Sequence, residues 1–205
     1  MSSIPILLAV EDELSESVAR TILKQIDRGY AVGTVFRRGG FGQLRKNAKE
    51  FNRAARGIPY LMLTDLDDSP CPSSLIADWL GTIEAAHPNF IFRIAIREVE
   101  AWLLADRTNL AEFLRVPDKL FPKEDVELLE DPKKTLVEIA ARSRSREIKE
   151  RIAPKRGSTA KQGPEYNACL DEFVRQGWNF RAAAREAPSL DRAVRCLAAF
   201  EPTWK

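Results

Sequence analysis

Residues 5–12 read PILLAVED, and residues 58–68 read IPYLMLTDLDD. Each stretch is a short apolar run that ends abruptly in acidic residues, which is the pattern of a buried strand. Two further runs, at residues 30–36 and 90–96, are rich in β-branched and aromatic residues. We therefore predict four strands, at residues 5–10, 30–36, 58–63 and 90–96.

Helical periodicity fills the segments between these strands. Apolar residues recur every three or four positions over residues 14–26, 44–55 and 73–86, and Ser73 stands where it can cap the third helix. Gly39, Gly40 and Gly42 predict a flexible turn before the second helix. Strands that alternate with helices favour parallel crossovers. We expect an α/β fold with a mostly parallel four-stranded sheet and helices on both faces.

The second half of the chain has a different pattern. After Glu98, short helical segments are separated by prolines and end with helices at residues 166–175 and 190–200, and we predict no further strand. Short helices are rarely stable alone. We expect an α/β domain over residues 1–106 and a helical C-terminal extension over residues 107–205 that packs on it.

The composition limits the chemistry. The chain has 205 residues, 44% of them apolar, and its apolar runs are far shorter than the roughly 20 residues that span a bilayer. With no membrane helix and no secretory signal, we expect a cytoplasmic protein with three reduced cysteines. The single histidine, His87, argues against a histidine-rich zinc site or a histidine-based catalytic pair. Carboxylates are therefore the expected catalytic groups.

Acidic residues gather where the predicted strands end. In a parallel sheet these ends lie at one edge, where ligands bind. Hard oxygen donors clustered there suit Mg²⁺ or Mn²⁺, which would relieve the repulsion between them. The predicted metal ligands are Glu11, Asp65, Asp67, Glu98 and Glu100. The alternative is that such acids form turns and helix caps, a role that suits Asp12, Glu13 and Asp68.

The net charge of +2 conceals two basic segments. Residues 37–56 contain seven basic residues and one acidic residue, and residues 142–161 contain eight and two, so each segment carries +6 and the remainder −10. Basic residues recur along one side of the second helix, as a phosphate backbone requires. This basic stripe consists of Arg45, Lys49, Arg53 and Arg56. A solvated helix face is the alternative interpretation.

The VED of residues 10–12 and the TDLDD of residues 64–68 resemble the TOPRIM domain of topoisomerases, primases and OLD-family nucleases, which pairs a Glu with a later DxD. The resemblance covers about half of the chain. The stretch IREVEAWLLAD at residues 96–106 is also similar to a motif of small TOPRIM-like proteins that are often encoded beside an ATPase in phage-defence gene pairs.

The resemblance implies roles for particular residues. Glu11 would be the metal-linked general acid or base, Asp65 and Asp67 would hold Mg²⁺, and Glu98 or Glu100 would complete the site. The cation that such nucleases place against the scissile phosphate would come from Lys155, Arg156 or Lys161. A flexible basic linker is the alternative for these three residues. The chain departs from the family pattern at Ser15 and Asp12, where an acid and a glycine are usual.

We predict a Mg²⁺-dependent nuclease or related phosphodiester-processing subunit that acts on DNA or RNA, with an ATPase partner protein implied by the resemblance. One rival is a response-regulator receiver, in which Asp65 would be phosphorylated while Asp12 and Glu13 bind Mg²⁺. Another is a non-catalytic subunit that binds nucleic acid or a partner. The number of metal ions and the formation of a homo-oligomer stay open.

Overall fold

The apolar runs that end in acids form the centre of a parallel sheet. The computed structural model describes residues 3–37, 40–82 and 86–204. In chain order the first part contains β1 (Ile4–Val10), α1 (Glu13–Gln25), β2 (Tyr30–Phe36), α2 (Gly40–Ala54), β3 (Tyr60–Asp65), α3 (Pro72–Leu80) and β4 (Phe90–Ala95). The four strands lie in the order β2-β1-β3-β4 and all pairs are parallel, which confirms the α/β prediction.

The sheet order creates a switch point at β1. The chain crosses from β1 to β2 on one side of it and then returns to β3 on the other side. Connections that leave in opposite directions open a crevice at the carboxyl ends of the two strands, and ligands bind in such crevices. Val10 pairs with Leu63 in the parallel register, so the residues that follow the two strands lie side by side at this edge.

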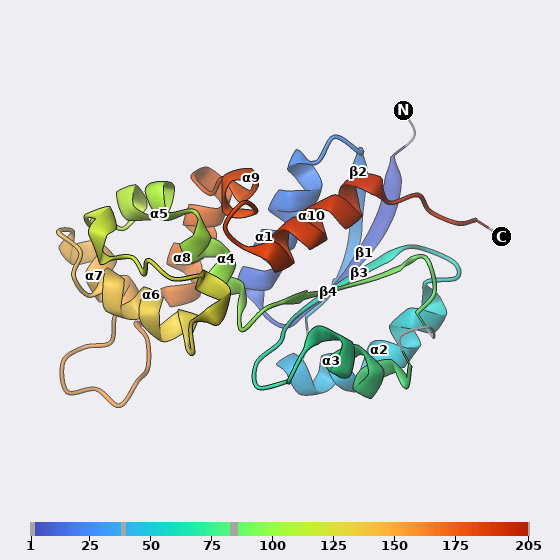
Figure 1. The fold of residues 1–205 in the computed structure, drawn as a ribbon, viewed down its shortest axis with the longest axis horizontal. Helices are drawn as coiled ribbons and strands as arrows, with labels where there is room; N and C mark the ends of the chain where they lie inside the picture. Colours follow the sequence, from blue (N-terminus) through green and yellow to red (C-terminus); the bar gives the residue numbers. More distant parts are fainter. Residues whose placement is uncertain (1–2, 38–39, 83–85, 205) are drawn as a thin grey trace. The chain divides into compact units, whose positions relative to one another are not determined.

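Both faces of the sheet are covered. The helices α2 and α3 pack on one face, where Leu44 and Trp79 join Ala9 and Met62 in a buried cluster. The helix α1 lies on the opposite face, together with the C-terminal part of α10 (Pro188–Ala199) (Figure 1). The strands β3 and β4 and the second half of β1 are buried because their apolar side chains meet a helix on each side, whereas β2, at the edge of the sheet, has no buried residue.

Two local predictions were wrong. The third helix ends at Leu80 and not at residue 86, because Gly81 adopts φ +99° at its C-cap, and its N-cap is Cys71, not Ser73. The glycine turn before the second helix is also shorter than expected. Gly40 and Gly42 lie within α2, while Gly39 is outside the described residues.

The remaining segment is helical, as predicted. It contains α4 (Val99–Ala105), α5 (Arg107–Phe113), η2 (Asp118–Leu120), η3 (Val126–Leu128), α6 (Pro132–Ala140), α7 (Arg146–Ile152), α8 (Tyr166–Gln176) and α9 (Phe180–Ala183). Every residue of α4 is buried, and this helix contacts α5, α6 and α9. Trp102 in α4 donates from Nε1 to Ser189 Oγ at 2.7 Å, and Trp178 donates to the carbonyl of Trp102. Both tryptophans are core residues.

The chain forms two compact units. Unit 1 consists of Met1–Ile96 and Arg192–Lys205, and unit 2 consists of Arg97–Asp191. The units thus change at residue 96, and the last segment belongs with the sheet. Within unit 1, Tyr30 donates to the carbonyl of Leu197, and the side-chain amide of Asn89 forms two hydrogen bonds with the backbone of Thr203. Within the described residues, no helix is long and apolar enough to cross a membrane.

Candidate functional site

Glu11 is held at the switch point of the sheet. It directly follows β1 and is partly buried beside the end of β3. Its Oε1 atom accepts hydrogen bonds from the hydroxyl of Thr64 and from the backbone N–H of Asp65, the latter at 3.1 Å. Within the described residues no donor reaches Oε2. The carboxylate is therefore fixed through Oε1, and Oε2 is available to a ligand. The parallel register therefore orients the side chain at the crevice.

Negative charge accumulates around Glu11. Burial raises the pKa of the Glu11 carboxyl above its ordinary value, against the two hydrogen bonds that lower it, and the charges of Asp67 and Asp12 raise it further. Asp67 is exposed and lies beyond the strand with φ +48°, so strand alternation does not govern its direction. Asp tolerates this left-handed conformation better than most residues. A cation at this edge would relieve the repulsion.

The two acids that follow Glu11 in the sequence have structural roles. Asp12 is the N-cap of α1 and accepts a hydrogen bond from the backbone N–H of Ser15 at 2.8 Å. Glu13 lies in the first turn of α1 and forms an ion pair with Arg37 at 3.4 Å. Both positions complement the positive end of the helix dipole. The capping alternative is therefore correct for Asp12, while Glu13 is part of the first helical turn.

The acids of unit 1 do not form a closed metal shell. Among the described residues, no three His, Cys, Asp or Glu side chains lie close enough to hold a metal ion. Mg²⁺, however, commonly takes one or two carboxylates and keeps several waters, and substrate phosphate completes its shell. The hard oxygens of Glu11, Asp65 and Asp67 have the right chemistry for such an open site.

Glu98 and Glu100 lie in unit 2 and form a second acidic group. Glu98 is partly buried, and its Oε2 accepts from the backbone N–H of Lys133 at 3.0 Å. Glu100 is buried, accepts from the hydroxyl of Tyr166 at 3.0 Å, and lies 3.5 Å from Lys133 Nζ. The same ammonium stands 5.1 Å from the centre of the Tyr166 ring. Glu100 is therefore committed to contacts within its unit.

The charge state of Glu98 is unusual for a carboxyl. Burial raises the pKa of Glu98 to about 7, and the nearby carboxylates of Glu100 and Asp131 raise it as well, against the hydrogen bond from Lys133 and the ammonium of the same residue. A group with such a pKa exchanges a proton near neutrality, as a general acid or base must. Next to it, Arg97 has a positive φ of 63°.

The predicted acids thus fall into two groups, one in each unit. The structure brings Glu11 to Asp65 and, separately, Glu98 to Glu100. Sequence reasoning missed Thr64 and Lys133. Thr64 lies inside the TDLDD stretch and could have been recognised there. Lys133 had no signal, because it is 35 residues from Glu98 and reaches it only through the packing of α6 on α4.

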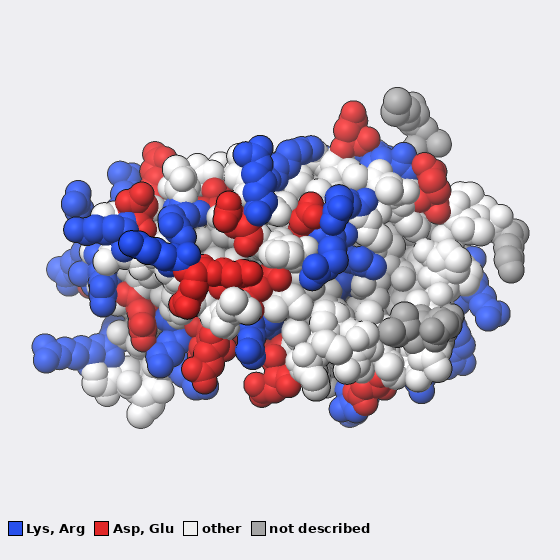
Figure 2. All heavy atoms as spheres, viewed as in Figure 1, with Lys and Arg blue, Asp and Glu red and all other residues white. Residues whose placement is uncertain are grey.

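The basic stripe is exposed along α2 and just beyond its end. Arg45 forms an ion pair with Asp78 of α3 at 2.9 Å, and Arg53 pairs with Glu50. Lys49 and Arg56 are exposed, and neither forms an ion pair with a described acid. Basic and acidic side chains are interspersed on the face shown in Figure 2. Both a solvated face and a phosphate-binding surface are compatible with this arrangement.

The basic residues expected to act on phosphate lie on a closed loop of unit 2. Lys155, Arg156 and Lys161 are exposed between α7 and α8, in the long loop that projects from these helices in Figure 1. The backbone N–H of Gly163 donates to the carbonyl of Ile152 at 2.7 Å and joins the two ends of the loop. Compact surface loops with close ends often carry function.

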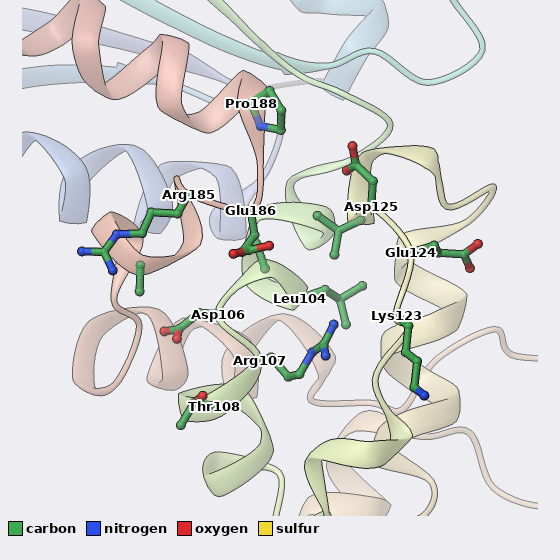
Figure 3. A pocket seen from close by; sticks show the side chains of 13 residues that line it. Leu104, Asp106, Arg107, Thr108, Lys123, Glu124, Asp125, Arg185, Glu186 and Pro188 are labelled. Carbon is green, nitrogen blue, oxygen red and sulfur yellow. The ribbon is translucent and has the colours of Figure 1, made fainter.

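A cavity of about 690 Å³ lies elsewhere in unit 2, between α4, α5 and α9. Its lining mixes charges: Glu186 and Arg107 project toward its middle, and Lys123 lies at its rim (Figure 3). Buried Asp106 beside it accepts from the side chain of Asn109 and the backbone of Asn179. None of the acids predicted from the sequence lines this cavity.

Comparison with known proteins adds no relative. No protein-family model, curated protein or solved structure matches the chain. Only the residues and their geometry therefore indicate a function.

Proposed function

We propose that the protein is a metal-dependent nuclease, or a related phosphodiester-processing subunit, that acts on nucleic acid through a TOPRIM-like domain. The observation that carries the proposal is the position of Glu11. Its carboxylate is fixed at the β1/β3 switch point by Thr64 and by the backbone of Asp65, with one oxygen directed away from these donors. Such an oriented acid beside further carboxylates is typical of metal-assisted phosphoryl chemistry.

Each group has a proposed role. One or two of the carboxylates of Glu11, Asp65 and Asp67 would hold Mg²⁺ or Mn²⁺, with waters and substrate phosphate completing its shell; the ion would neutralise phosphoryl charge and make its bound water more acidic. The second oxygen of Glu11, which no described donor reaches, would assist proton transfer or bind a second ion. The exposed stripe on α2 would hold the nucleic-acid backbone, and Lys155 or Arg156 would face the phosphate.

A receiver is the second candidate, because its sheets share the strand order 2-1-3-4 seen here. In that case Asp65 is the phosphoacceptor, and Asp12 and Glu13 bind Mg²⁺. Two contacts disfavour this function: Asp12 is occupied as the cap of α1, and Glu13 is paired with Arg37. Within the described residues, the sheet also lacks a fifth strand. We therefore favour the nuclease.

The decisive experiment measures cleavage of supercoiled plasmid and of single-stranded DNA and RNA in Mg²⁺ or Mn²⁺. We expect Glu11→Gln and Asp65→Asn to reduce cleavage by at least about 100-fold, since each removes a charged ligand. Asp68→Asn, which changes an exposed acid beside Asp67, serves as the control and should cleave normally. Cleavage that survives both site substitutions would show that the site is wrong.

Two further results discriminate the rivals. Acetyl-phosphate labelling that disappears in Asp65→Asn indicates a receiver. Salt-dependent nucleic-acid binding without cleavage under any condition indicates a binding subunit. The same assay repeated with an ATPase expressed from a neighbouring gene tests whether the protein is active only with such a partner.

A further inference from the structure

A groove in unit 2 brings two arginines together. It lies where the chain leaves α5 and where it approaches α7, and its volume is about 730 Å³. Its charged lining residues are Arg115, Arg144 and Glu112. Both arginines are exposed, and neither forms an ion pair with a described acid. The lining of the groove includes none of the acids of the candidate site and no residue of the loop that carries Lys155.

The backbone fixes this pair of arginines. Arg144 donates its backbone N–H to the carbonyl of Arg115 at 3.1 Å, so two segments 29 positions apart are joined at the residues that carry the guanidinium groups. The arginines therefore do not depend on flexible loops for their proximity. Fixing the backbones that carry two cationic side chains before a ligand arrives lowers part of the entropic cost of binding an anion.

The conformation of Arg115 is costly for an arginine. The C-terminus of α5 is a Schellman motif: Val116 N–H donates to the carbonyl of Ala111, and Arg115 N–H donates to that of Glu112. Arg115 occupies the position that this motif usually gives to glycine and has φ +55°. Left-handed conformations of residues other than glycine are concentrated at ligand-binding sites. A side chain kept here against its backbone preference indicates a use for the side chain.

We propose that this groove binds phosphate groups of a nucleic-acid backbone between Arg115 and Arg144. Guanidinium groups bind phosphate oxygens through paired hydrogen bonds, and two such groups can hold one phosphate or two consecutive ones. Glu112 is the only acid that lines the groove among the described residues, and its carboxylate opposes the anion. This inference rests on the proposed function for one point, namely that the bound phosphates belong to a nucleic acid.

The test measures binding of a fluorescently labelled single-stranded oligonucleotide by anisotropy, in EDTA, so that no cleavage is needed. We expect Arg115→Gly and Arg144→Gln each to weaken binding by at least about threefold and to lower the salt slope by about 1. Glu112→Gln should strengthen binding. Arg185→Gln changes an exposed arginine of the same unit outside the groove and should bind like the wild type.

Arg115→Gly also separates binding from folding. Glycine suits the left-handed position, so this variant should melt at a higher temperature than the wild type while it binds more weakly. Wild-type affinity and salt slope in Arg115→Gly and Arg144→Gln would overturn the proposal. Tight binding of ATP or inorganic phosphate that depends on both arginines, without oligonucleotide binding, would overturn the backbone assignment. Cleavage that survives Glu11→Gln, together with binding in EDTA that depends on both arginines, would refute the proposed catalytic site and leave the groove supported.

Discussion

Glu98 is the residue for which the structure predicts the clearest response to pH. Its carboxyl has a pKa of about 7 in the folded protein, raised from 4.5 by burial and by Glu100. The folded state therefore binds a proton more tightly than the unfolded state does. Between pH 4.5 and 7, ionisation of Glu98 progressively destabilises the fold, and below pH 4.5 this penalty is absent.

Glu98→Gln should remove the penalty, because glutamine is neutral and can still accept from the backbone of Lys133. Glu98 is only partly buried, so solvent screening reduces the effect. We expect the difference in unfolding free energy between the variant and the wild type to shift by about 1–2 kcal/mol in favour of the variant when the pH rises from 4 to above 7. Urea denaturation at a series of pH values measures the difference. Parallel pH profiles for the two proteins would contradict the raised pKa.

Thr64 is the second residue with a specific expectation. Its side chain is fully buried and its hydroxyl donates to Glu11. Thr64→Val keeps the shape but leaves the carboxylate with one donor fewer, so we expect a loss of about 1.5–3 kcal/mol in unfolding free energy. Cleavage should also fall, because Glu11 loses its orientation.

Thr64→Ser is the matched control, since it keeps the hydroxyl and removes only a methyl group. It should lose about 1 kcal/mol from the small cavity and retain most of the cleavage activity. Denaturation and cleavage measured on both variants separate orientation from packing. Equal cleavage by the valine and serine variants would mean that the hydroxyl does not position Glu11.

Sequence reasoning was successful at this scale where chemistry is local. Glu11 and Asp65 were placed side by side because parallel strands end at one edge, and the hydrogen bond between them confirms that juxtaposition. Lys133 and Tyr166 were missed as partners of Glu98 and Glu100. Contacts between helices that are far apart in the sequence have no regular spacing from which they could be predicted. The metal ligands as a set stay a prediction.

At the scale of elements, apolar, β-branched and aromatic runs predicted all four strands, because the central strands are buried on both faces and must be continuously apolar. The order of the strands in the sheet was not predicted. Helix ends were less accurate. The end of α3 was signalled by Gly81, whose left-handed conformation stops the helix, but the apolar periodicity beyond it suggested a longer helix. The pairing of the loop ends at Ile152 and Gly163 had no sequence signal beyond the glycine itself.

The loop that carries Lys155 and Arg156 depends on Gly163. A Cβ atom at this position would lie 2.3 Å from the carbonyl oxygen of Arg151, so the backbone would have to move. We expect Gly163→Ala to destabilise the protein by about 1–3 kcal/mol through this overpacking. The displaced loop should also reduce cleavage if its basic residues face the phosphate. Thermal denaturation and the plasmid assay measure the two effects.

Gly42→Ala is the control for this substitution. Gly42 lies in α2, its Cβ would meet no atom within 4 Å, and alanine favours the helix. The variant should be as stable as the wild type or more stable by about 0.5–1 kcal/mol. A Gly163→Ala protein with wild-type stability would show that the loop ends are free to separate.

At the scale of the whole molecule, the net charge of +2 is distributed unevenly within each unit. Unit 1 contains 14 basic and 12 acidic residues, and unit 2 contains 18 of each. Each unit nevertheless includes one segment of +6, at residues 37–56 and 142–161 respectively. A protein that binds nucleic acid through both units needs no large net charge, because counterion release depends on the phosphates contacted and not on total charge.

This distribution predicts how binding should respond to salt. If one nucleic-acid strand contacts both segments, neutralising either segment should lower the slope of log affinity against log salt concentration. One variant changes Arg45, Lys49 and Arg53 of unit 1 to Gln. The other changes Lys155, Arg156 and Lys161 of unit 2 to Gln. Each triple variant removes three cations, so each slope should fall by up to about 2–3, and the two effects should add when the changes are combined. Anisotropy titrations of a labelled oligonucleotide in EDTA at several salt concentrations measure the slopes.

Changing Lys119, Lys123 and Arg185 to Gln removes the same charge outside both segments and should leave the slope unchanged. An equal fall in this control would show that binding follows total charge, and a fall in only one of the two test variants would confine the nucleic acid to that unit.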